Sequence, residues 1–459
     1  MQLKQLPLRR LLRWSCSLCS GVVLLGMVIL PPRAFSFPPR DEPSEVFGVA
    51  HVDGKYFLTT EDFLDEGADQ ILATGSKVIK LYLDPRRYPW NSSWPKDIQS
   101  LAQMALASYS CYTFLDTPER LGQAVEYLAA HLPPTAVFGR DAHSVYLGEF
   151  GYPETGEGGL DALNRRIDNA IKVVRDQGLP WAVFWEIYCN EPVKKALQLP
   201  LNGKENNANL RGFWMVKPDG TPGLAWHRYR RLFANADPDR ATTQAIKSKL
   251  KQVFGDSFNR PDGKELGTGW TQASHYGVVN ERLAHHRVRF EIPDGHDIPW
   301  GSATLDLANR AILGHGLQVG DYFEVTLQRL SEQGGLGVEL FDSDQLRVGG
   351  DLRSGPSMLQ AWNGTTWVSV AFDDHGQPVS FDWNGSHTLG VRFDSADGHW
   401  TTFSYYLDGF YAGSWLIASP NRKLDKIGFF VQSRTAGSAF EFGDLKVFAV
   451  RRSSARASF

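Results

Sequence analysis

Two short apolar runs that each carry a glutamate near their end constrain the fold of this chain more than any other feature. They are residues 147–152 (LGEFGY) and 183–188 (VFWEIY). A strand of a parallel sheet is buried on both faces and has a continuous apolar sequence, and in α/β barrels the functional groups lie where such strands end. Glu149 and Glu186 are therefore candidate site residues.

The segment between the runs has the pattern of an amphipathic helix. Residues 161–177 carry apolar side chains at helical spacing, and Gly178 follows as a stop signal. The apolar stripe consists of Leu163, Ile167, Ile171 and Val174. Strand, helix and strand predict a βαβ unit, and hence a parallel sheet.

The runs and their flanks resemble strands seven and eight of (β/α)8 glycoside hydrolases of the retaining two-glutamate clan. The matching residues are 145–154 (VYLGEFGYPE) and 181–192 (WAVFWEIYCNEP). Further resemblance covers the opening strands and the closing loop and helix of such barrels, at residues 47–50, 77–83, 212–220 and 224–229. The resemblance implies a TIM-barrel-like α/β domain over residues 41–233.

The resemblance also implies roles for single residues. Glu149 corresponds to the nucleophile, and Trp185 corresponds to the aromatic platform under the reactive sugar ring. Tyr152 and Tyr188 are further candidate substrate contacts beside these two positions. The expected substrate is a β-linked polysaccharide or oligosaccharide, and no cofactor or metal is implied.

The middle of such a barrel is missing from the sequence. A full barrel has about 250 residues, whereas residues 41–233 supply about 190. No Asn-Glu pair preceded by an apolar run occurs between Leu83 and Val145, where the acid/base glutamate is expected. The sequence therefore predicts a smaller layered α/β domain or a dimer that completes it, unless the gene model has lost the middle strands.

A substitute acid is needed if hydrolysis survives. Glu186 is the best candidate because it also ends an apolar run, although alternation along a strand turns it away from the side of Trp185. Glu191, Glu154 and Asp84 are weaker candidates.

Composition limits the remaining possibilities. The chain has 459 residues, enough for two domains. Residues 1–36 carry five basic side chains and no acid, so the rest has a formal charge of −8 against −3 for the whole chain. This charge argues against a nucleic-acid partner.

The first 36 residues have the form of an export signal. Basic residues precede an apolar run at 21–30, and small residues follow it. The run is shorter than the roughly 20 residues needed to span a bilayer, so a cleaved signal is preferred to an uncleaved anchor. The mature protein is expected to be secreted or periplasmic. Its two cysteines, Cys111 and Cys189, are expected either to pair or, preferably, to stay as buried free thiols.

The second half has the pattern of an antiparallel β-sandwich. After a polar linker or solvated helix at 234–252, short alternating strands separated by Gly, Asp and Asn turns continue to residue 450, before a basic tail at 451–459. Residues 254–263, 266–270, 406–411 and 440–450 resemble concanavalin-like or laminin-G-like jelly rolls. Asp256 and Asp444 are expected in turn or surface roles rather than as calcium ligands.

Aromatic residues of the jelly roll are candidate sugar platforms, because the C–H face of a sugar packs on a ring. For each tryptophan the competing expectation is a core position. The candidates are Trp362, Trp367, Trp383, Trp400 and Trp415, of which the first two are favoured. Two functions remain open: a secreted glycoside hydrolase with Glu149 as nucleophile, and an inactive carbohydrate-binding protein that uses the jelly roll.

Overall fold

The computed structural model divides into two compact units, Met1–Ala236 and Asp237–Phe459. No helix in the described part of the chain is long and apolar enough to cross a membrane. The expected export signal, Asp84 and the basic tail lie outside the described residues. The structure describes residues 42–52, 63–82, 107–112, 115–131, 145–189, 191, 210–237, 240–274, 279–293, 300–309, 312–331, 333–341, 345–351, 358–362, 366–373, 377–383, 385–396, 400–418 and 424–450.

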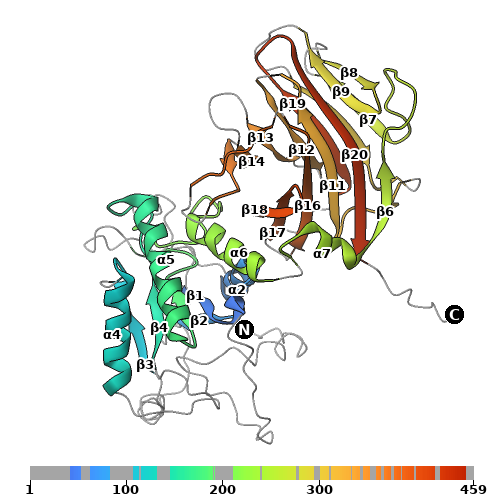
Figure 1. Cartoon of the computed structure of the whole chain (residues 1–459). Coiled ribbons are helices and arrows are strands. Elements are labelled where there is room, and N and C mark those ends of the chain that lie inside the picture. The colour runs from blue at the N-terminus through green and yellow to red at the C-terminus, as the bar shows by residue number, and fades with distance from the viewer. Residues whose placement is uncertain are drawn as a thin grey trace, which may run out of the picture. The chain divides into compact units, whose positions relative to one another are not determined.

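The N-terminal unit is built on a parallel sheet (Figure 1). The strand order is β2-β1-β5-β4-β3. Every neighbouring pair in this sheet is parallel. Its strands are β1 (Phe47–Val52), β2 (Ile79–Tyr82), β3 (Ala107–Ser110), β4 (Val145–Phe150) and β5 (Ala182–Phe184). Its helices are η1 (Pro43–Glu45), α2 (Phe63–Thr74), α4 (Pro118–His131), α5 (Gly159–Gln177) and α6 (Leu224–Ala236).

The predicted βαβ unit is confirmed as β4, α5 and β5. Helix α5 ends at Gly178, which has a φ of 61° and donates its N–H to the carbonyls of Arg175 and Val174. This left-handed position favours glycine. Helix α6 packs on the sheet through Tyr229, whose ring makes edge contacts with Phe47 and Phe184.

The C-terminal unit contains two antiparallel sheets (Figure 1). One has the order β15-β14-β13-β12-β19-β10-β7, and the other has the order β18-β17-β16-β11-β20-β9-β8, with β6 also paired to β20. The first sheet consists of β7 (Trp270–Ser274), β10 (Trp300–Asp306), β12 (Gly335–Phe341), β13 (Gln345–Asp351), β14 (Met358–Trp362), β15 (Trp367–Ser369) and β19 (Lys426–Gln432). The second consists of β6 (Leu250–Asp256), β8 (Asn280–Ala284), β9 (Arg287–Ile292), β11 (Tyr322–Arg329), β16 (His387–Ala396), β17 (Trp400–Leu407), β18 (Phe410–Ala418) and β20 (Ser438–Val450). The predicted antiparallel architecture is confirmed.

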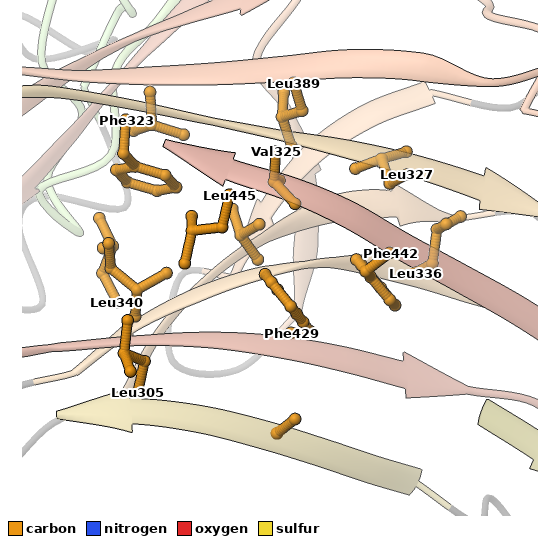
Figure 2. Packing of buried hydrophobic residues seen from close by; sticks show 14 of the residues in the cluster. Leu305, Phe323, Val325, Leu327, Leu336, Leu340, Leu389, Phe429, Phe442 and Leu445 are labelled. Atoms are coloured by element: carbon orange, nitrogen blue, oxygen red, sulfur yellow. The ribbon is translucent and has the colours of Figure 1, made fainter. Parts of the chain in front are cut away.

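The core of this unit lies between the two sheets. Alternate residues of β19 enter it, and Phe429 stacks on Phe442 of β20 with ring centroids 4.8 Å apart and planes 2° apart (Figure 2). Trp383 and Trp415 also belong to this core. The core position weighed for each tryptophan is therefore confirmed for these two, while the side chain of Trp400 lies outside the described residues.

The stretch 234–252, expected as a linker or a solvated helix, is structured throughout its described part. It holds the end of α6, the short helix α7 (Thr243–Ser248) and the start of β6. Ile246 and Leu250, four positions apart, are buried against Tyr322 of the second sheet. The polar composition of the stretch gave no signal in the sequence for this small apolar face.

An ion pair also fixes α7 to the second sheet. Lys247 Nζ lies 2.9 Å from Oε2 of the buried Glu324. Lys247→Met is expected to lower the free energy of unfolding by about 1–2 kcal/mol, because the variant leaves the buried charge of Glu324 without this cation. The loss is smaller than for a fully buried ion pair because the lysine side chain is only partly buried. Urea denaturation measures the change. Lys251→Met, at an exposed position of β6, is the control and should stay within about 0.5 kcal/mol.

Candidate functional site

The parallel sheet curls so that side chains of distant strands meet. Lys80 lies on β2 and Glu149 on β4, with β1 and β5 between them. In a flat sheet these backbones would lie about 14 Å apart, too far for a lysine side chain to reach a carbonyl on β4. Lys80 Nζ nevertheless donates to the Gly148 carbonyl at 2.9 Å and lies 3.2 Å from Glu149 Oε1. Both side chains therefore lie on the concave face of the sheet.

Lys80 and Tyr112 both contact the Glu149 carboxylate. Lys80 contacts Oε1, and the hydroxyl of Tyr112, just after β3, donates to Oε2 at 3.1 Å. Burial raises the pKa of Tyr112 well above its usual range, and the charge of Glu149 raises it further. Tyr112 therefore remains a neutral donor.

A second set of contacts begins at Trp185, directly after β5. Its Nε1 donates to Glu191 Oε1 at 2.7 Å, and Glu191 Oε2 pairs with Arg211 Nη1 at 2.5 Å. The Arg211 guanidinium lies over the ring of Phe213, 4.9 Å from the centroid. Phe213 in turn makes an edge contact with Tyr112. The indole is half-buried, so part of it remains accessible.

These contacts form one continuous group, called here the edge cluster. It consists of Lys80, Tyr112, Glu149, Trp185, Glu191, Arg211 and Phe213. Sequence reasoning found Glu149 and Trp185 and ranked Glu191 low. It missed Lys80, although the charged residue inside the apolar run 77–83 was a usable signal. Tyr112 and Arg211 carried no local signal, because the carboxylates that they contact are distant in sequence.

Glu186 and Tyr188 are not brought to the surface with Glu149. Both have no exposed surface. The charge of Glu186 adds to burial in raising the pKa of the Cys189 thiol to about 11. The expectation that Glu186 replaces the missing acid therefore meets a physical objection, because a fully buried carboxyl offers no contact to a polysaccharide.

Other predicted residues have structural partners. The Tyr152 ring lies under the Arg166 guanidinium at 3.7 Å, and its hydroxyl donates to the Glu157 carbonyl at 2.9 Å. Glu154 accepts a hydrogen bond from the N–H of Leu224 at 2.7 Å, where α6 begins. An acid at the N-terminus of a helix is stabilising.

The thiols and Asp256 are also accounted for. Cys111 and Cys189 are buried and free, as preferred from the sequence. Asp256 accepts hydrogen bonds from Arg260, from the indole of Trp270 and from the N–H of Phe258. Among the described residues no group of three or more His, Cys, Asp or Glu side chains is placed to hold a metal ion.

An aromatic cluster lies on the outer face of the first sheet of the C-terminal unit. Trp362 of β14 pairs directly with Trp367 of β15, with ring centroids 5.7 Å apart. The Trp367 ring stacks on Phe430 of β19 at 5.5 Å, with 16° between the planes. Both tryptophans are half-buried, so neither occupies the core. The aromatic cluster is defined here as Trp362, Trp367 and Phe430.

Comparison with known proteins gives only distant likenesses. No protein-family model and no curated protein matches the chain. Among solved structures, a sialidase is similar at 13% identity over 46% of this chain, with a TM-score of 0.32, and the match spans 19% of the sialidase. The carbohydrate recognition domain of Emp47p is similar at 17% identity over 44% of this chain and 98% of that domain, with a TM-score of 0.28. A β-1,3-glucanase from Mycobacterium marinum is similar at 13% identity over 43% of this chain and 98% of the glucanase, with a TM-score of 0.30.

Proposed function

We propose that this protein is a secreted protein that binds β-linked polysaccharide. The observation that supports this most directly is the edge cluster, where a half-buried indole, Trp185, belongs to the same contact network as Glu149 and its two donors. An indole face packs against the C–H face of a sugar, while charged and polar groups bond to its hydroxyls. The aromatic cluster of the C-terminal unit is proposed as a second contact surface.

The strand order supports descent of the N-terminal unit from a retaining (β/α)8 glycoside hydrolase. In a closed barrel the first strand lies between the second and the last, and the last lies beside the one before it. Here β1 lies between β2 and β5, and β5 lies beside β4, all in parallel. Under this proposal β4 and β5 correspond to strands seven and eight, and Glu149 occupies the position of the nucleophile.

Binding is better supported than turnover. Retaining hydrolysis needs a carboxylic acid about 5 Å from the nucleophile. Of the described candidates, Glu186 is fully buried, Glu191 is bonded to Trp185 and Arg211, and Glu154 is bonded at the start of α6. Burial therefore keeps Glu186 from a leaving group, and other partners hold Glu191 and Glu154.

Retention of the protein by polymer tests the proposal. The full chain should be retarded in gels that contain soluble β-glucan, mannan or glycol chitin. Trp185→Ala should weaken the retarding interaction roughly three- to tenfold, the amount expected for losing one aromatic platform. Tyr127→Ala, at an exposed tyrosine of α4, is the matched control. Equal migration with and without every polymer would overturn the proposal.

A second candidate function, retaining hydrolysis, is favoured by the contacts that Lys80 and Tyr112 make with Glu149. A nucleophile must be held in one orientation, and these contacts hold the carboxylate through both of its oxygens. Dinitrophenyl β-glycosides test this chemistry because their leaving group needs no acid. Phenolate release that disappears in Glu149→Gln would support a hydrolase, whereas the binding proposal predicts no release by either protein.

A further inference from the structure

We propose that Phe430 is the platform of a glycan subsite and that the Trp367 side chain occupies the place of the sugar ring in this structure. The inference rests on the proposed carbohydrate function and deepens it. It places the platform on the outer face of the first sheet and gives that platform a ligand class. It also makes Trp367 a cap, a side chain of the protein itself that covers the platform until a sugar ring displaces it.

Small residues surround the Phe430 ring on its face of the sheet. Its direct neighbours across the strands are Ser302 of β10 and Gly337 of β12. Gly428 lies two positions before it on β19, and Gly337 is paired in turn with Gly349 of β13. Alternate residues of a strand share a face. The ring therefore lies beside a row of glycines, called here the glycine lane, which consists of Gly428, Gly337 and Gly349. A ligand can approach the backbone closely there, because glycine has no side chain.

The Trp367 ring reaches Phe430 only because the sheet folds back on itself. Strands β15 and β19 are separated by β14, β13 and β12, about 19 Å in a flat sheet. The two ring centroids are nevertheless 5.5 Å apart, with planes 16° apart. The hairpin of β14 and β15 therefore curves over the glycine lane. The Trp367 ring covers the face of Phe430, a position that one pyranose ring could take with its C–H face against Phe430.

Polar residues border this space. Ser302 lies beside Phe430, and Glu339, two positions after Gly337 on β12, is directly paired with Gly428. Both are almost fully buried on this face in the capped state, so a sugar reaches them only after Trp367 has moved away. A flat ring with polar groups at its edge is the arrangement that binds a sugar by its C–H face and its hydroxyls. The ligand class is a neutral glycan with flat C–H faces, such as a β-linked glucan.

Self-capping has a measurable consequence. If Trp367 must leave before a sugar ring can enter, the apparent affinity is reduced by the fraction of molecules that are open. Removing the cap should therefore tighten glycan binding, and removing the platform should weaken it. If Trp367 were instead an ordinary platform, its removal would weaken glycan binding.

Isothermal titration of the full chain with cellohexaose and laminarihexaose distinguishes these cases. Trp367→Leu replaces the flat ring by a smaller side chain that cannot stack on Phe430, and should bind roughly three- to tenfold tighter than the wild type. Phe430→Leu should bind at least threefold more weakly. Phe410→Ala, at an exposed aromatic of β18, is the matched control and should not change affinity. Trp367→Ala repeats the first measurement, and thermal unfolding confirms that each variant is folded.

The outcomes separate this inference from the proposed function. Tighter binding by both Trp367 variants supports the cap. Weaker or unchanged binding by both, while the wild type still binds, overturns the cap but leaves carbohydrate binding intact. Absence of binding by the wild type and by every variant, together with no retardation in polymer gels, overturns both.

Discussion

Phe429→Ala is expected to lower the free energy of unfolding of the C-terminal unit by about 3–5 kcal/mol, the usual cost of deleting a buried aromatic ring. Phe429 has no exposed surface and stacks on Phe442 at 4.8 Å. It also contacts Trp270 and Phe258, at centroid distances of 5.0 and 6.1 Å. Figure 2 shows it in the layer between the sheets. Alanine would leave a cavity, because the surrounding rings belong to three other segments and cannot move together to fill it.

Urea denaturation followed by circular dichroism and tryptophan fluorescence measures this loss. Phe429→Leu keeps most of the volume and should cost less than half as much. Phe410→Ala removes a ring that is 68% exposed and should change the midpoint little. A loss below about 1 kcal/mol for Phe429→Ala would contradict the described core.

Glu281→Gln is expected to stabilise the C-terminal unit at pH 8 and to have little effect near pH 4.5. Glu281 lies on β8 opposite Phe290, on the face of the core, and both carboxylate oxygens are buried. Burial raises its pKa from 4.5 to about 8, against a smaller opposing influence of Gln272 and the Ser302 backbone. Strand β10 approaches so closely that a Cβ on Gly301 would lie 3.0 Å from Glu281 Oε1.

The sign follows from proton binding. Between pH 4.5 and 8 the unfolded chain releases the Glu281 proton and the folded chain keeps it, so the free energy of unfolding falls as the pH rises. Glutamine carries no such proton. The variant should therefore gain about 2 kcal/mol over the wild type at pH 8, a value reduced for the partial exposure of the side chain.

Thermal unfolding of both proteins at several pH values tests this expectation. The difference between their midpoints should grow from pH 4.5 to pH 8 and then level off. Glu291→Gln, at an ion-paired carboxylate on the neighbouring strand β9, is the control and should not stabilise at any pH. A constant difference across the range would refute the buried carboxyl as its cause.

Local patterns predicted the local elements well. The 3.6-residue stripe and Gly178 predicted α5, and the two continuous apolar runs predicted the neighbouring parallel strands β4 and β5. Alternation predicted strands of the sandwich, because each strand has one face in the core. The polar stretch 234–252, expected as a linker or a solvated helix, holds the short helix α7, whose buried apolar face gave no periodic signal because two apolar residues are too few.

The candidate site was predictable only where a residue ends a strand. Glu149 and Trp185 follow that rule, and the structure places both in the edge cluster. Glu186 obeys the same rule but is fully buried. Whether a strand-end side chain faces a cleft or the interior depends on the local path of the backbone, which composition does not reveal.

The sequence by itself determined helix α5, the strands β4 and β5 that flank it and the alternating strands of the sandwich, because periodicity and turn chemistry act between near neighbours. Only the tertiary structure decided which distant groups meet. The curl of one sheet brings Lys80 to Glu149, and the fold of another lays Trp367 on Phe430. Curvature arises from the packing of whole layers, so no single segment encodes it.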